Sequence, residues 1–217
     1  MSRRVLFYTL YERIWHWAQA FGILLLLLSG FQIHYPTAFP LFGTLSTAVN
    51  IHSVIGFLLV LNAFLGFFYT LTSNKIREYL PMPVDFTRGI FEQARYYLWG
   101  IFHGDPHPYE KSPLKKLNPM QKITYFFLLN LFLPFQLVTG MLLWSSTTLP
   151  EFFDRIGGLR ILGPLHTLAA FFFLAFLVVH LYLSTTGSTP LELTKEMIFG
   201  YGEVHDDGAG EIYKEET

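Results

Sequence analysis

Between Ile14 and Asn74 the chain contains no Asp, Glu, Lys or Arg. A helix needs about 20 apolar residues to cross the hydrocarbon core of a bilayer, so this stretch has room for two spans. Pro36, Pro40 and Gly43 lie near its middle, where a turn between two helices is expected. The stretch is too long and too apolar for an ordinary soluble domain and predicts a membrane protein.

Two further charge-free runs, residues 123–150 and 161–191, each predict one more span. The expected fold is therefore all-α, an integral membrane four-helix bundle. The predicted spans are residues 13–34, 49–72, 121–145 and 162–185, the third with a kink at Pro134. These spans belong to one domain over residues 1–190, which includes an amphipathic interfacial helix over 84–102, and residues 191–217 are expected to form an acidic cytoplasmic tail.

The distribution of basic residues predicts the orientation of the spans. Thirteen of the 15 Lys and Arg residues fall in the first segment, the second loop and the tail. The only two on the other side are Arg155 and Arg160. Because basic loops stay in the cytoplasm, both termini are predicted to be cytoplasmic.

Composition excludes several classes of function. Charged residues make up 14% of the chain, against about 25% in a typical soluble domain. The net charge of −1 gives no basic field for nucleic acid, so the expected surroundings are the lipid bilayer and protein partners. The chain has no Cys, which excludes disulfides, thiolate-held iron–sulfur clusters and covalently attached c-type haem within it.

Four of the eight histidines lie inside the predicted spans, where ionisable residues are costly and usually functional. His16 is near the cytoplasmic start of the first span, and His180 is near the cytoplasmic end of the fourth. His52 and His166 lie at the outer ends of the second and fourth spans. Each membrane level therefore holds one pair, His16 with His180 and His52 with His166.

The spacing along the fourth span sharpens this pattern. His166 and His180 are 14 residues apart, close to four helical turns, so both side chains leave the same face about 21 Å apart along the axis. Two neutral imidazoles that meet across a bundle are the axial ligands that a b-type haem iron uses. The sequence thus predicts two b-type haems, with His16 and His180 on the inner iron and His52 and His166 on the outer iron.

The sequence also offers three alternatives to this prediction. His34, at the outer end of the first span, could replace His52 or His166 as an outer ligand. Zinc is the rival metal, but it requires three or four ligands at one depth, whereas the histidines fall in two distant pairs. A non-redox membrane anchor or a small transporter is the alternative function, although transporters usually carry charges near the midplane of the bilayer.

Several stretches resemble one known group of proteins. They are Tyr11–Trp17, Ile51–Gly56, Asn118–Lys122, Val138–Gly140 with Trp144, and Leu165–His166 through His180–Tyr182. With these residues the chain resembles the gamma subunit of membrane-bound respiratory formate dehydrogenase. The wider group of prokaryotic di-haem cytochrome b subunits also includes those of thiosulfate reductase and nickel–iron hydrogenase.

The resemblance implies the same ligand pairs and adds a quinone site at the cytoplasmic haem. That site would be formed by His180, Asn118 and the backbone near Met120, a position where relatives often have glycine. The quinone would be menaquinone or ubiquinone. Asn118 is also a candidate N-cap of the third span, and it could serve as a helix cap and a quinone contact at the same time.

The resemblance also implies a place in a larger complex of the prokaryotic inner membrane. The expected function is that of the cytochrome b subunit of a respiratory oxidoreductase complex, which passes electrons between an outer-face partner and the quinone. That partner would be an iron–sulfur subunit or a multihaem cytochrome c, with a further subunit that carries out the substrate chemistry. The sequence does not choose between quinone reduction and quinol oxidation.

Overall fold

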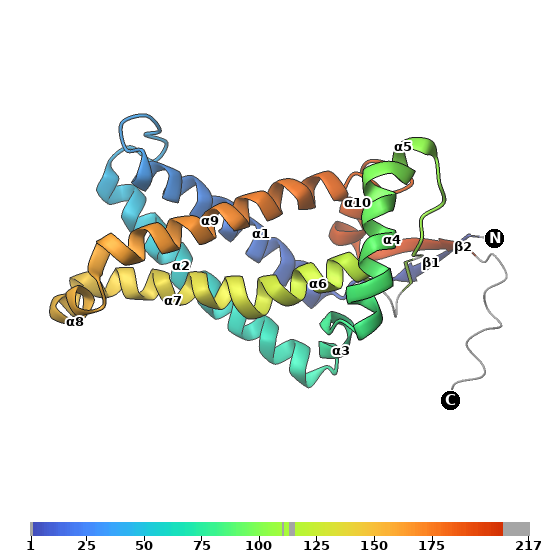
Figure 1. Ribbon diagram of the computed structural model, residues 1–217, viewed down its shortest axis with the longest axis horizontal. Coiled ribbons are helices and arrows are strands. Elements are labelled where there is room, and N and C mark those ends of the chain that lie inside the picture. The colour runs from blue at the N-terminus through green and yellow to red at the C-terminus, as the bar shows by residue number, and fades with distance from the viewer. Residues whose placement is uncertain (1, 110, 113–115, 206–217) are drawn as a thin grey trace. The chain divides into compact units, whose positions relative to one another are not determined.

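The computed structural model describes residues 2–109, 111–112 and 116–205 and is mostly helical (Figure 1). Within these residues, four helices are long and apolar enough to cross a membrane. They are α1 (Leu10–His34), α2 (Leu45–Thr72), a third helix over Pro119–Thr147, and α9 (Gly158–Leu183). The chain is therefore a multi-pass membrane protein, as its charge-free runs predict.

The helices begin a few residues before the predicted starts because polar side chains cap them. At the start of α1, Glu12 accepts a hydrogen bond from the backbone N–H of Thr9 (2.7 Å), and the Thr9 hydroxyl accepts one from that of Glu12 (3.3 Å). This reciprocal capping box satisfies two backbone donors. Thr44 caps α2 through a hydrogen bond from the backbone N–H of Thr47 (3.1 Å).

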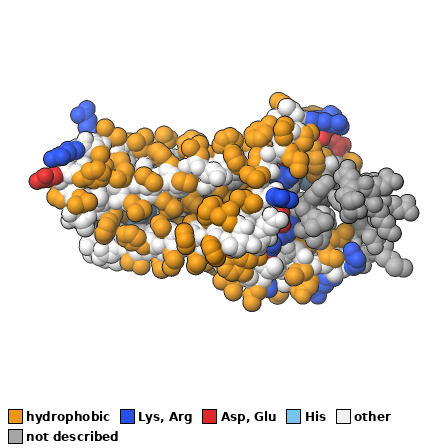
Figure 2. Space-filling view, turned by 90° about the horizontal axis from the view of Figure 1, so that it is seen from below, with side chains coloured by type: hydrophobic (Ala, Val, Ile, Leu, Met, Phe, Trp, Pro, Cys, Tyr) orange, Lys and Arg blue, Asp and Glu red, His pale blue; other side chains and the backbone are white. Residues whose placement is uncertain are grey.

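Large apolar side chains on the spanning helices point outward. Phe64, Phe67 and Val178 are about 60% exposed, and Figure 2 shows hydrophobic side chains across the surface of the helices. Ser29, Gln32 and Thr139, by contrast, are buried. This inverted distribution suits a bundle that is surrounded by lipid and keeps its polar groups inside.

The described chain divides into two compact units. Residues 14–76 and 125–181 form the spanning unit, and the described residues within 2–13, 77–124 and 182–205 belong to the flanking unit. The expected division at residue 190 differs from this arrangement. Residues 192–205 form secondary structure that pairs with the N-terminus, whereas residues 206–217 of the expected tail lie outside the described residues.

Polar contacts and a glycine join α1 to α2 in the spanning unit. The indole N–H of Trp15 donates to the carbonyl of Asn62 (2.9 Å), and the Asn62 amide donates to Oε1 of Gln19 (2.8 Å). A Cβ on Gly66 would collide with the Trp15 indole, so a glycine at this position lets the two helices approach closely.

The third span changes its helical geometry just before Pro134. It runs through α6 (Pro119–Phe127), the π-helical segment η3 (Leu128–Phe132), α7 (Leu133–Trp144) and the 3₁₀ turn η4 (Ser145–Thr147). Pro134 has no N–H to continue the α-helical pattern, and a wider turn accommodates this loss. The irregularity thus lies where the proline predicts a kink. A short helix, α8 (Pro150–Arg155), precedes α9.

In the flanking unit, the two ends of the described chain form a small antiparallel sheet. Strand β1 (Ser2–Leu6) pairs with β2 (Tyr201–His205), which follows helix α10 (Glu192–Phe199). Gly200 turns the chain between α10 and β2 with a φ of +88°, a conformation that favours glycine. Four spans return the chain to the side where it began, so this pairing agrees with the four-span topology.

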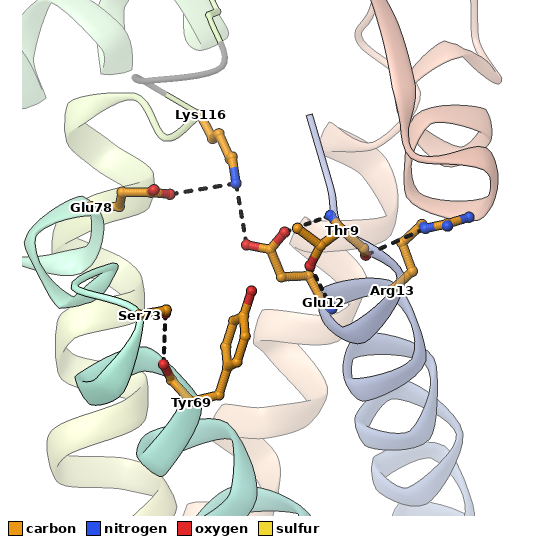
Figure 3. Close-up of polar contacts among 7 residues, drawn as sticks. All are labelled: Thr9, Glu12, Arg13, Tyr69, Ser73, Glu78 and Lys116. Carbon is orange, nitrogen blue, oxygen red and sulfur yellow. Dashed lines mark hydrogen bonds and ion pairs between the residues drawn. The ribbon is translucent and has the colours of Figure 1, made fainter. Parts of the chain in front are cut away.

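Partly buried ion pairs connect the segments of the flanking unit. Lys111 pairs with Glu196, whose residue exposure is only 4%. Figure 3 shows Lys116 between Glu12 (3.2 Å) and Glu78 (3.6 Å). Burial raises the pKa of Tyr8 above its usual value, and the nearby carboxylates of Glu196, Glu12 and Glu78 add to this effect.

A helical stretch of the flanking unit covers most of the range predicted for an interfacial helix. It consists of η1 (Asp85–Gly89), α4 (Ile90–Arg95), η2 (Tyr96–Gly100) and α5 (Ile101–His103), and it follows the short helix α3 (Ile76–Tyr79). Phe91, Leu98 and Phe102 are each more than 70% exposed. An exposed apolar face is expected of a helix that lies at a membrane surface.

Candidate functional site

The structure brings the four span histidines together as two pairs within the spanning unit. The ring centres of His16 and His180 are 6.2 Å apart, and those of His52 and His166 are 6.1 Å apart. Each pair joins a residue of α9 to one from another helix, α1 for the first pair and α2 for the second. These are the pairs that the depth pattern of the sequence predicts.

The spacing of each pair fits two axial ligands of a single metal ion. Metal–imidazole bonds of about 2.0 Å place the centres of two rings on opposite sides of one metal about 6 Å apart. Within the described residues, no group of three or more His, Cys, Asp or Glu side chains is arranged to hold a metal ion. The pairs therefore suit a cofactor that provides the remaining ligands itself, as a porphyrin does.

Ser29 lies within hydrogen-bond distance of His52 and of two carbonyls of its own helix. The Ser29 hydroxyl donates to the carbonyl of Leu25 (2.7 Å), with a longer contact to that of Leu26 (3.2 Å). Its oxygen also lies 2.9 Å from Nδ1 of His52. With its proton on a carbonyl, this oxygen is able to accept from Nδ1–H in the tautomer that leaves the lone pair of neutral His52 on Nε2.

Thr139 holds His166 in the same way. Its hydroxyl donates to the carbonyl of Phe135 (2.8 Å) and lies 2.9 Å from Nδ1 of His166. The side-chain amide nitrogen of Gln136 lies 3.1 Å from Nε2 of His166. Both outer histidines thus have a hydroxyl at Nδ1 that is placed to accept from the tautomer in which Nε2 can bind a metal ion.

Glycines next to these hydroxyl residues make room for the imidazoles. A Cβ on Gly140 would lie 3.2 Å from Cε1 of His166, and one on Gly30 would lie 3.5 Å from Cε1 of His52. Each outer histidine thus faces a hydroxyl residue followed by glycine, Ser29-Gly30 on α1 or Thr139-Gly140 on α7.

A large apolar cavity surrounds the outer pair. Its volume is about 1030 Å³, and its lining includes His52, His166 and Gln136. Pockets for small molecules and cofactors are typically about 300–1,000 Å³, apolar, and supplied with a few oriented polar groups. This cavity is thus large enough for a bulky planar cofactor between the two imidazoles.

The inner pair has different surroundings. Nδ1 of His16 is buried and makes no hydrogen bond with any described residue. The His16 ring packs edge-on against Trp17 (5.2 Å between centres), and the His180 ring stacks on Phe176 (5.5 Å). Aromatic contacts therefore orient these rings where hydroxyl groups orient the outer ones.

His34 lines the outer cavity, but its ring packs against Tyr35, with 4.6 Å between the centres. The ring of His166 lies opposite that of His52, with 6.1 Å between the ring centres. The geometry therefore favours these two over His34 as the outer pair.

The residues predicted to contact quinone fall in different units. His180 belongs to the spanning unit, whereas Asn118 and Met120 belong to the flanking unit. Oδ1 of Asn118 accepts from the backbone N–H of Gln121 (2.8 Å), and its Nδ2 donates to the Tyr97 hydroxyl (3.0 Å). Asn118 is thus an N-cap of α6, and Met120 lies in the first turn of that helix.

Comparison with known proteins identifies the family. A family model described as prokaryotic cytochrome b561 matches residues 7–200, nearly the whole described chain. The chain belongs to the prokaryotic cytochrome b561 family. As a member, this cytochrome is a membrane electron-transfer protein with b-type haem, a cofactor that needs no covalent bond to Cys.

Two relatives of this cytochrome show the breadth of the similarity. YdhU of Escherichia coli (strain K12), which is named as a cytochrome, is 34% identical over 204 residues, covering 92% of this chain and 75% of YdhU. YedZ1 of Azospira oryzae, named as a subunit of a protein-methionine-sulfoxide reductase, is 25% identical over 179 residues. That alignment covers 77% of this chain and 84% of YedZ1.

Sequence reasoning missed the residues that orient the outer histidines. Ser29 and Gln136 were not singled out, and Thr139 was noted only within the stretch Val138–Gly140. A polar residue followed by glycine in an otherwise apolar helix was the available signal. Its histidine partner lies on another helix in both cases, so the sequence alone did not show what the hydroxyl contacts.

Proposed function

We propose that this cytochrome is a subunit of a respiratory complex and transfers electrons between a partner on the outer face and a quinone on the cytoplasmic face. Two b-type haems would carry the electrons, the inner one held by His16 and His180 and the outer one by His52 and His166. The ring spacing of about 6 Å in both pairs is the observation that carries the proposal.

Each part of the chain has a defined task in this proposal. Haem supplies a one-electron redox couple when bound. The imidazoles hold the iron, the Ser29 and Thr139 hydroxyls orient the outer imidazoles, and the apolar cavity excludes water. We assign the substrate chemistry to another subunit, as the family resemblance implies.

The distribution of basic residues supports a prokaryotic inner-membrane protein whose two termini are in the cytoplasm. Thirteen of its 15 Lys and Arg residues fall in the segments that are predicted to lie on the same side as the termini. The connections over residues 35–48 and 146–161 would then face outward and dock the redox partner. An iron–sulfur subunit or a multihaem cytochrome c, with a further catalytic subunit, is the proposed partner, and the subunit name of YedZ1 supports membership of a complex.

The proposed quinone, menaquinone or ubiquinone, would exchange electrons with the inner haem. The family resemblance assigns Asn118, Met120 and His180 to this site. Replacement of Asn118 separates its two roles, because Ser also caps helices well but lacks the amide. We expect Asn118→Ser to keep the fold and slow electron transfer to quinone.

The direct test is rapid mixing of the reduced cytochrome with a short-chain menaquinone analogue. The proposal expects fast reoxidation of haem in the wild type and slower reoxidation in Asn118→Ser with the same haem content. Reoxidation at equal rates would remove Asn118 from the quinone site. A cytochrome that contains haem but does not react with quinones would contradict the quinone assignment. Absence of haem would instead favour a membrane anchor.

A further inference from the structure

We infer that Ser29 and Thr139 are positioning residues that lower the reduction potential of the outer haem relative to the inner one. The inference rests on the proposed function, because it requires a haem at each histidine pair. It concerns two hydroxyl groups that lie beside the proposed ligands and do not touch the iron site themselves.

The chemistry follows from the direction of the hydrogen bonds. Each hydroxyl lies within hydrogen-bond distance of a backbone carbonyl of its own helix and of Nδ1 of His52 or His166. With Nε2 bound to iron, the proton of the neutral imidazole would be on Nδ1, and the hydroxyl oxygen would accept it. An acceptor at Nδ1 draws the ring proton away and makes Nε2 a stronger electron donor. A stronger donor stabilises ferric iron more than ferrous iron, and the reduction potential falls.

The described contacts of the inner pair are different. Nδ1 of His16 is buried without a hydrogen-bond partner among the described residues, and the His180 ring packs against the rings of His16 and Phe176. Without an acceptor the imidazole of His16 is a weaker electron donor, which favours ferrous iron. We therefore expect the two haems to differ in reduction potential, with the lower potential at the outer site.

This difference has a consequence for the distribution of electrons between the two haems. At equilibrium an electron shared by two couples resides mostly on the one of higher potential. An outer haem of lower potential therefore leaves a shared electron mostly on the cytoplasmic haem, beside the proposed quinone site. The potentials of the outer-face partner and of the quinone set the net direction of flow.

Redox potentiometry of the full-length cytochrome in detergent tests the inference. Thr139→Val and Ser29→Ala remove the acceptors, Thr139→Ser restores one, and Thr70→Val is the matched control. The Thr70 hydroxyl also donates to a carbonyl of its own helix, that of Gly66 (2.7 Å), and has no histidine partner. Haem content and the low-spin electron paramagnetic resonance signals of each variant are measured in parallel.

We expect the lower of two potentials to rise in Thr139→Val and Ser29→Ala, while the higher one stays constant. Loss of such a contact to a metal ligand changes affinity by about tenfold or more, and a tenfold change in the ferric preference corresponds to about 59 mV for one electron. Thr139→Ser and Thr70→Val should match the wild type. If Thr139→Val instead loses one haem, its return in Thr139→Ser supports the same role.

The inference is overturned if both potentials stay unchanged, or if the higher potential is the one that responds. Its failure is distinguishable from failure of the proposed function. If the wild type contains two haems and their potentials do not change when the hydroxyls are removed, the inference fails but the assignment of the ligand pairs is not contradicted. A wild type with fewer than two haems would contradict the pairs themselves.

Discussion

Gly140 faces His166 so closely that a Cβ on Gly140 would lie 3.2 Å from Cε1 of the imidazole. The adjacent Thr139 binds Nδ1 of the same ring (2.9 Å). One dipeptide of α7 therefore limits both the position and the rotation of this proposed ligand. Ser29 and Gly30 of α1 form the same arrangement around His52.

Gly140→Ala should weaken binding of the outer haem, because the new methyl group pushes the His166 ring out of place. We expect about a tenfold loss of affinity, as for other changes beside metal ligands. Gly163→Ala is the control, since its Cβ would meet only the flexible side chain of Leu159 (3.3 Å) in the same cavity. Haem content after purification measures the difference, and equal haem retention by both variants would show that the contact of Gly140 with His166 does not matter for haem binding.

His52→Ala should remove the outer haem and leave the inner one. The His16 and His180 rings contact neither His52 nor His166 directly, so the inner pair remains intact. His34→Ala should keep both haems. Difference spectra with a haem count separate these outcomes, and retention of two haems by His52→Ala would refute its role as a ligand.

Glu196→Gln should loosen the sheet that joins the two ends of the described chain. Glu196 is 4% exposed and pairs with Lys111, whose side chain is 27% exposed. We expect a local cost of about 2 kcal/mol, below the 3–5 kcal/mol of a fully buried pair. Hydrogen exchange at residues 2–6 and 201–205 should accelerate.

The control for this prediction is Glu151→Gln. Glu151 and Arg155 form an ion pair of 3.9 Å in which both side chains are at least 80% exposed. Exposed pairs contribute about 0–1 kcal/mol. If hydrogen exchange in β1 and β2 is equally slow in Glu196→Gln and Glu151→Gln, the Lys111–Glu196 pair does not stabilise the sheet.

Acid should destabilise the start of α10. Partial burial opposes ionisation of Glu192, but hydrogen bonds from Ser188 and the backbone of Thr189 outweigh it, so the pKa of Glu192 lies below its usual 4.5. The folded state therefore binds fewer protons, and its stability is full above that value and falls as pH drops below it. Hydrogen exchange of α10 should accelerate on acidification in the wild type but change less in Glu192→Gln, and equal pH dependence would contradict this origin.

The sequence predicted the spans and the histidine pairs because both depend on periodic features. A charge-free run of fixed length specifies a membrane helix, and the 14-residue interval between His166 and His180 places both on one face. The alternation of spans then determines which ends share a side of the membrane. These inferences need no knowledge of side-chain packing.

Contacts between distant segments were not accessible in the same way. Residues 192–205 belong to the segment that the sequence assigns to an acidic tail, yet they contain α10 and the partner strand of β1. The Lys111–Glu196 pair that accompanies this sheet joins residues 85 positions apart. The hydroxyl partners of His52 and His166 likewise lie on other helices, 23 and 27 residues away in the sequence.

A pyridine haemochrome count on the purified, haem-supplied chain tests whether the four histidines hold two b-type haems. We expect two b-type haems per polypeptide, together with a reduced-minus-oxidised spectrum of low-spin haem. One haem or none in a folded preparation would show that at least one histidine pair does not bind haem.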